Sequence, residues 1–115
     1  MKVCASQRTH ELREHMRGGD GTAVLDTVPT ELLPAHTRLA GVITLKQGCS
    51  IGSHAHEGET EIFVFHAGEG RVEDNGEDKP VGPGDVVLTG GGATHAVANT
   101  GEEDLVFTAV IVTEA

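Results

Sequence analysis

Turn signals interrupt this 115-residue chain so often that only short elements fit between them. Glycine accounts for 16 residues, and the runs Gly18-Gly19, Asn75-Gly76 and Gly90-Gly91-Gly92 mark tight turns. Asn75-Gly76 is the strongest hairpin signal, because both central positions of a type I′ turn need a positive φ. A chain divided in this way favours short strands over long helices.

The segments between the turns are rich in β-branched and apolar residues and predict a series of short strands. They cover residues 22–28, 38–46, 51–56, 61–67, 71–74, 85–89, 94–99 and 104–113. Before them, Leu12 and Met16 stand at helical spacing, so residues 6–17 predict a short helix or an ordered arm. At most one helix among so many strands is typical of an all-β sandwich or jelly-roll barrel in a single domain.

Charge and composition exclude several classes of partner. Eight basic and 18 acidic residues give a formal net charge of −10, which is unsuited to nucleic acid or to an anionic membrane surface. The first residues contain no apolar run of signal-peptide length, and Cys4 and Cys49 form at most one pair. We therefore expect a cytoplasmic protein with free thiols that binds neither nucleic acid nor membrane.

Two of the predicted strands are apolar on both faces. In residues 61–67, Phe63 and Phe65 share one face while Ile62 and Val64 share the other, and residues 105–112 are equally apolar. A strand with one solvent-exposed face should alternate, so the second face must be covered by another sheet or by another subunit. A domain this small has little of its own to cover it, and we expect a homodimer.

Three histidines and one glutamate carry the chemistry. In an extended chain, residues two apart point to the same side, so His54 and His56 project together, as two imidazoles on one metal ion must. A four-residue turn separates them from Glu61, which shares the face of Phe63. A carboxylate on an interior face is costly unless it is paired or bound to a metal. His95 follows the triple-glycine turn and can approach the same ion from a neighbouring strand.

The spacing of these residues resembles the two motifs of the cupin superfamily. The first motif is matched at each fixed position, by Gly48, His54, His56, Glu61 and Gly68. The second is matched by Gly84, His95 and Asn99, and it departs at Gly90, which stands where the superfamily pattern has proline. Because proline restricts φ, its absence predicts a more mobile loop before His95.

The resemblance implies a single cupin domain over residues 1–115. Residues 1–21 would form an N-terminal arm or short helix, and residues 22–115 a double-stranded β-helix, the jelly-roll cupin barrel. The resemblance also implies a divalent metal ion held by His54, His56, Glu61 and His95. A six-coordinate ion would keep two positions open, which suits Mn, Fe, Co or Ni, whereas Zn more often closes at four ligands. The sequence does not distinguish among these metals.

Small cupins of this kind are most similar to oxalate-decarboxylase-like proteins, which implies a metal-dependent decarboxylase or dioxygenase acting on a small oxygen-rich acid. Such chemistry needs an acid–base group near the metal. Glu57 and Glu59 lie in the turn between the candidate ligands and are expected to face solvent. The absence of such a group favours one alternative, a non-catalytic module that binds or senses a small-molecule ligand. A second alternative is a metal-dependent sugar isomerase.

Two further sets of side chains are candidates to line the pocket. Phe63 lies two residues from Glu61 on the same face and is expected at the pocket floor. Arg38, which opens a strand, or Arg17, in the N-terminal arm, can hold a substrate carboxylate. Because a phosphosugar needs a basic cluster at the barrel mouth, the scarcity of Lys and Arg favours an acid over a phosphosugar.

Overall fold

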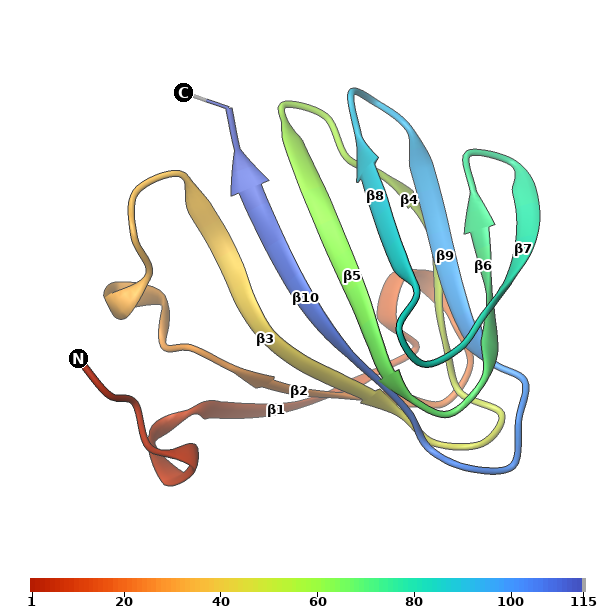
Figure 1. Ribbon diagram of the computed structural model, residues 1–115, viewed down its shortest axis with the longest axis horizontal. Helices are drawn as coiled ribbons and strands as arrows, with labels where there is room; N and C mark the ends of the chain where they lie inside the picture. The colour runs from red at the N-terminus through yellow and green to blue at the C-terminus, as the bar shows by residue number, and fades with distance from the viewer. Residues whose placement is uncertain (115) are drawn as a thin grey trace.

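Strands make up most of the computed structural model, which describes residues 1–114 (Figure 1). Within that range the strands are β1 (Thr9–Glu14), β2 (Thr22–Thr27), β3 (Thr37–Leu45), β4 (Ser50–Ala55), β5 (Glu59–Ala67), β6 (Gly70–Asp74), β7 (Glu77–Val81), β8 (Val86–Gly90), β9 (Thr94–Asn99) and β10 (Leu105–Thr113). They form two antiparallel sheets: sheet A in the order β1-β2-β3-β10-β5-β8, and sheet B in the order β4-β9-β6-β7. The predicted all-β jelly roll is confirmed.

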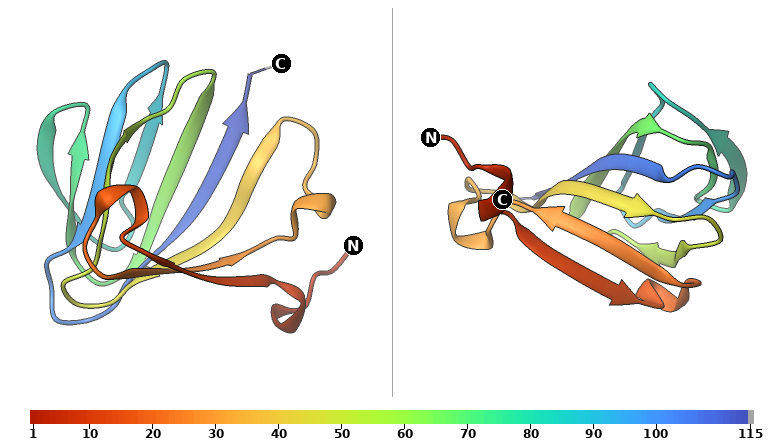
Figure 2. Two further views of the ribbon diagram at one scale, coloured as in Figure 1. Left: turned by 180° about the vertical axis from the view of Figure 1, so that it is seen from behind. Right: turned by 90° about the horizontal axis from the view of Figure 1, so that it is seen from below.

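Alternation of burial along the strands places the core between the two sheets (Figure 2). In β10 every second side chain from Leu105 to Ile111 is buried, and β9 follows the same period of two. The rings of Phe63 and Phe65 pack against Phe107, with centroids 4.8 Å and 5.1 Å away. These three phenylalanines, each at most 2% exposed, form the centre of the core.

The N-terminal segment is an ordered arm that joins sheet A as a strand, and of the two forms expected for residues 6–17 the helix is absent. A 3-10 turn covers Ala5–Gln7, and β1 then pairs with β2 along its whole length. Leu12 lies on the outer face of sheet A, and Met16 packs against the core from the next 3-10 turn. The spacing of two apolar residues is a weak helix signal, and the hydrogen-bonding edge of β2 outweighs it. In residues 1–114, no helix is long and apolar enough to cross a membrane.

The Asn75-Gly76 hairpin is confirmed, and it joins β6 to a strand that the sequence did not predict. Asn75 has φ 49° and Gly76 has φ 92°, as a type I′ turn requires. Residues 77–81 continue as β7, which contains Pro80. Proline is tolerated because β7 is the edge of sheet B, where one backbone side needs no partner.

Asn99, the last residue of the second cupin-like motif, ties together the end of the barrel away from the histidines. Its Nδ2 donates to the carbonyl oxygens of Leu45 and Glu103, both at 2.8 Å. Its Oδ1 accepts the backbone N–H of Gly101 at 2.9 Å. The side chain is buried with both polar ends paired, so its role is structural.

Candidate metal centre

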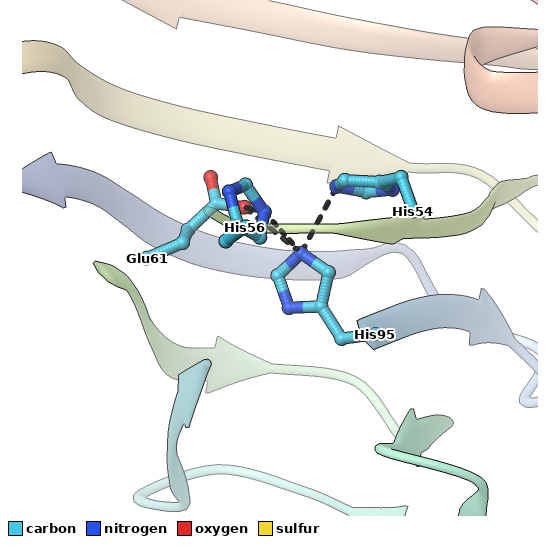
Figure 3. A group of neighbouring side chains, drawn as sticks. All are labelled: His54, His56, Glu61 and His95. Carbon is cyan, nitrogen blue, oxygen red and sulfur yellow. Dashed lines mark hydrogen bonds and ion pairs between the residues drawn. The ribbon is translucent and has the colours of Figure 1, made fainter. Parts of the chain in front are cut away.

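The four candidate ligands come from three strands and meet inside the barrel (Figure 3). His54 lies in β4 directly opposite His95 in β9, and His56 follows the end of β4. Glu61 lies in β5 of the other sheet and reaches the group from the facing layer. One nitrogen or oxygen of each residue lies within 4.8 Å of the others, so the four residues predicted from the sequence form one cluster.

The atoms that meet are three imidazole nitrogens and one carboxylate oxygen. His95 Nε2 lies 2.9 Å from His56 Nε2 and 3.1 Å from His54 Nε2. Glu61 Oε1 lies 3.0 Å from the Nε2 atoms of both His56 and His95. With metal–nitrogen bonds of about 2.1 Å, neighbouring ligands at right angles lie about 3.0 Å apart, so these separations suit one central ion.

In His54 and His56, the ring nitrogen that points away from the cluster makes a hydrogen bond, and this bond determines which nitrogen carries no proton. His54 Nδ1 donates to the carbonyl oxygen of Gly52 at 2.8 Å, and His56 Nδ1 donates to Glu59 Oε2 at 2.5 Å. A carbonyl or an ionised carboxylate can only accept, so each proton sits on Nδ1 and each Nε2 lone pair faces the centre. Bare lone pairs and a carboxylate oxygen at this spacing repel one another, and a divalent cation between them removes the repulsion. Burial also lowers the pKa of His54, which favours its neutral form.

His95 is held by packing where the other two rings are held by hydrogen bonds. Its Nδ1 has no hydrogen-bond partner among residues 1–114. The ring instead stacks on Phe63, with centroids 4.7 Å apart and planes 11° from parallel. Phe63, expected at the pocket floor, therefore lies against one of the candidate ligands.

Glu59 is the residue near the centre that the sequence interpretation placed wrongly. It was expected to face solvent, yet its side chain is 14% exposed and bonds to His56. Arg38 donates to the same carboxylate through Nε at 2.9 Å and Nη2 at 2.7 Å. The Arg38 guanidinium is the main reason that the pKa of Glu59 falls to about 2. The alternation of side chains along a strand could have predicted this position, because residues 59, 61 and 63 share one face of β5.

The other charged candidates lie outside this cluster. Arg38 was expected to bind a substrate carboxylate, but in the structure it binds the carboxylate of Glu59. Arg17 lies in the exposed 3-10 turn Met16–Gly18, which packs beside β4, and its charge contributes to the lowered pKa of His54. Glu57 is exposed, as expected.

The triple-glycine turn before His95 is fixed to the strand that carries His56. The Gly92 N–H donates to the carbonyl oxygen of His56 at 2.8 Å, and the His56 N–H donates to that of Ala93 at 3.1 Å. Gly90 packs so closely on β5 that a Cβ atom there would collide with Thr60 Oγ1. Backbone hydrogen bonds therefore restrain this loop in the absence of proline, and the mobility expected from the sequence stays a prediction.

A jelly roll with three histidines and a glutamate converging between its sheets is the architecture of a cupin. The family model for the cupin domain Cupin_2 matches residues 41–111, and the chain belongs to this family. An oxalate-binding protein of Thermotoga maritima is 42% identical over 113 residues, which cover 97% of this chain and 93% of that protein.

Solved structures agree with this assignment. A crystal structure from Thermotoga maritima, described as a predicted oxalate decarboxylase, is 41% identical with a TM-score of 0.91 and covers 98% of this chain and 99% of that one. A putative sugar phosphate isomerase from Acidithiobacillus ferrooxidans is 21% identical with a TM-score of 0.77, over 96% of this chain and 74% of that one. At that identity the second likeness concerns the fold alone.

Glu73 of β6 braces the two strands that carry His54 and His95. Its Oε1 accepts the Ser53 hydroxyl at 2.6 Å. Its Oε2 accepts the Thr94 hydroxyl at 3.0 Å and the Gly76 N–H at 2.8 Å. These donors, Ser53 first, hold the pKa of Glu73 below its usual range.

Substitution Glu73→Gln is expected to lower the free energy of unfolding of the metal-free protein by about 1 kcal/mol at neutral pH, because an amide has one acceptor oxygen for three donors. Since the folded-state pKa of Glu73 lies below the ordinary value of 4.5, the ionised form stabilises the fold above that value. The stabilisation disappears as the pH falls through the folded-state pKa. Urea denaturation at several pH values should therefore find the difference shrinking towards acid. A difference that is constant with pH, or equally large for Glu102→Gln on the exposed surface, would contradict this role.

Proposed function

We propose that the protein binds a divalent metal ion through His54, His56, Glu61 and His95 and, through that ion, a small dicarboxylate of the oxalate class. The observation that carries the proposal is the cluster of three histidine Nε2 atoms and one Glu61 carboxylate oxygen. The similarity to a Thermotoga protein named for oxalate binding, over nearly the whole chain, supports the choice of ligand. When bound, the ion supplies a Lewis acid with open positions for carboxylate oxygens.

The donor set favours a six-coordinate ion such as Mn²⁺, Fe²⁺, Co²⁺ or Ni²⁺ over Zn²⁺. Contacts of 2.9–3.1 Å among the ligand atoms match right-angled neighbours. Tetrahedral neighbours at the same bond length lie about 3.4 Å apart. Four protein ligands then leave two positions, the number that a chelating dicarboxylate needs.

Catalysis is the second candidate, since a structure 41% identical to this chain is described as a predicted oxalate decarboxylase. Decarboxylation needs a group that delivers a proton close to the metal. Glu59 is engaged by both His56 and Arg38, and Glu57 is exposed, which favours binding over turnover. The sugar-isomerase alternative has support only at the level of the fold.

Metal loading tests the first half of the proposal. Protein stripped with a chelator and then incubated with Mn²⁺ should retain about one ion per chain by elemental analysis. Free metal at 100 times its dissociation constant should raise the free energy of unfolding by about 2.7 kcal/mol. His54→Ala and His95→Ala should lose the ion, whereas the control His66→Ala, at an exposed position, should keep it. Equal metal content in all four proteins would contradict the assignment.

Titration with oxalate tests the second half. Calorimetry should detect oxalate binding to the Mn²⁺-loaded protein and none to the metal-free protein, because the acid is expected to bind through the ion. Succinate should bind more weakly, since its carboxylates are too far apart for a compact chelate ring. ¹³C-labelled oxalate that is recovered unchanged favours a binding module, and steady release of formate favours the decarboxylase. Oxalate binding that ignores the metal would overturn the proposal.

We also propose that the outer face of sheet A pairs with a second copy of the chain. Sheet B covers only the inner face, and the outer face carries apolar side chains from several strands: Leu12, Val24, Val42, Ile62, Val64, Val86, Leu88, Val106, Val110 and Val112. Leu88 is 64% exposed and Val86 52%. With a net charge of −10, two copies of the chain repel each other through their charged surfaces. An apolar patch can face the same patch on a second copy with few negative side chains opposed, so it is self-complementary.

The size of this face suits a stable dimer. Six strands about 4.8 Å apart and about seven residues long span roughly 24 by 24 Å, or about 600 Å². A standard interface buries about 800 Å² on each side, so the face approaches the required area.

Light scattering on a sizing column should therefore give a dimer for the wild type. Val64→Glu and Leu88→Glu should shift the protein to a monomer, because each places a charge in the apolar contact. Leu32→Glu, on a 3-10 turn away from this face, is the matched control and should remain a dimer. A monomeric wild type, or dimers in all variants, would contradict the proposal.

A further inference from the structure

We infer that Glu59 is a positioning residue for the metal centre and that Arg38 holds Glu59 in place. The pair would fix the ring of His56 so that its Nε2 lone pair faces the ion. This inference rests on the metal-binding half of the proposed function and goes beyond it, because neither residue is one of the four ligands.

The hydrogen bonds around the Glu59 carboxylate leave it one orientation. Oε1 accepts Arg38 Nε at 2.9 Å, while Oε2 accepts both Arg38 Nη2 at 2.7 Å and His56 Nδ1 at 2.5 Å. A two-pronged guanidinium contact fixes the plane of a carboxylate as well as its position. The oxygen that meets the imidazole is therefore set by Arg38.

Burial deepens along this chain of three side chains. Arg38 is 50% exposed, Glu59 14% and His56 2%. A carboxylate at the depth of Glu59 is costly without a partner, and Arg38 supplies that partner from the solvent side. The arrangement leads from the surface to a buried candidate ligand through two charge-assisted hydrogen bonds.

A β-bulge directs Arg38 to this position. The pairing of β3 with β10 skips a residue, with Ile111 opposite Leu39 and Val112 opposite Thr37. Arg38 is the extra residue, and a bulge re-aims the side chain of the residue it adds. Its guanidinium reaches Glu59 of β5, which lies on the other side of β10 in sheet A.

Each of the three histidine rings is held by a different partner. The support of His56 can therefore be removed by substitution without touching the supports of the other two rings. His54 donates to a main-chain carbonyl, and His95 stacks on Phe63. His56 depends on a side-chain carboxylate. Outer hydrogen bonds of this kind orient metal-bound imidazoles, and their loss typically weakens metal binding by about 10–100-fold.

Metal dissociation constants test the inference. Competition with a chelator for Co²⁺ or Mn²⁺ should give binding about 10–100-fold weaker in Glu59→Ala than in the wild type. Glu59→Gln keeps an acceptor for His56 Nδ1 and should recover part of the loss, while Arg38→Met should weaken binding less than Glu59→Ala. The matched control is Arg71→Met, which removes another arginine–carboxylate pair, to Asp78 at 2.9 Å, between two exposed side chains. It should leave the affinity unchanged.

The tautomer of His56 separates positioning from a purely structural ion pair. In the metal-free wild type, ¹⁵N shifts should identify His56 with a protonated Nδ1 and a bare Nε2. Glu59→Ala should give a mixture of His56 tautomers. If the alanine variant does not fold, the same ¹⁵N shifts are measured in Glu59→Gln or Arg38→Met. A structural pair would lower the melting temperature without changing tautomer or affinity, and that result would overturn the inference. A wild type that binds no metal would instead refute the proposed function.

Discussion

The structure depends on the close approach of three imidazole nitrogens and a carboxylate oxygen between its two sheets. His56 Nε2, whose ring proton lies on Nδ1, is 3.0 Å from Glu61 Oε1 with no proton between them, so without a cation the two atoms repel each other. Such an arrangement persists only if the surrounding strands hold each ring rigidly. The two facing sheets satisfy this condition, because strands of both reach the centre and each is anchored in the core beside it.

Three kinds of support hold the three rings, and they differ in strength and direction. A main-chain carbonyl gives His54 a partner that no side-chain substitution removes. The face of Phe63 limits rotation of His95 through shape alone, since stacked rings have little freedom to tilt. The carboxylate of Glu59 adds charge, which strengthens the hydrogen bond to His56. Only this last support reaches the solvent, through Arg38.

Much of the fold and the grouping of His54, His56 and Glu61 could be predicted from local pattern, whereas the full ligand set, with His95, is what the resemblance to the cupin motifs implies. Alternation along strands such as β9 and β10 depends on nearest neighbours, and the spacing of His54, His56 and Glu61 follows from the geometry of one extended chain and one turn. The misses involve relations between distant segments. β1 forms because β2 offers an edge, and Arg38 reaches Glu59 because β3 bulges against β10. Glu59 was missed by a smaller error, since the strand was predicted to begin at residue 61, two residues late.

The contact between Gly90 and Thr60 has a consequence for how this chain can vary. Gly90 stands where the superfamily pattern has proline, and a Cβ atom at this position would collide with Thr60 Oγ1. A larger residue at position 90 therefore requires the Thr60 side chain to move or to be replaced by a smaller one, so the loop that precedes His95 can change only together with the strand that carries Glu61.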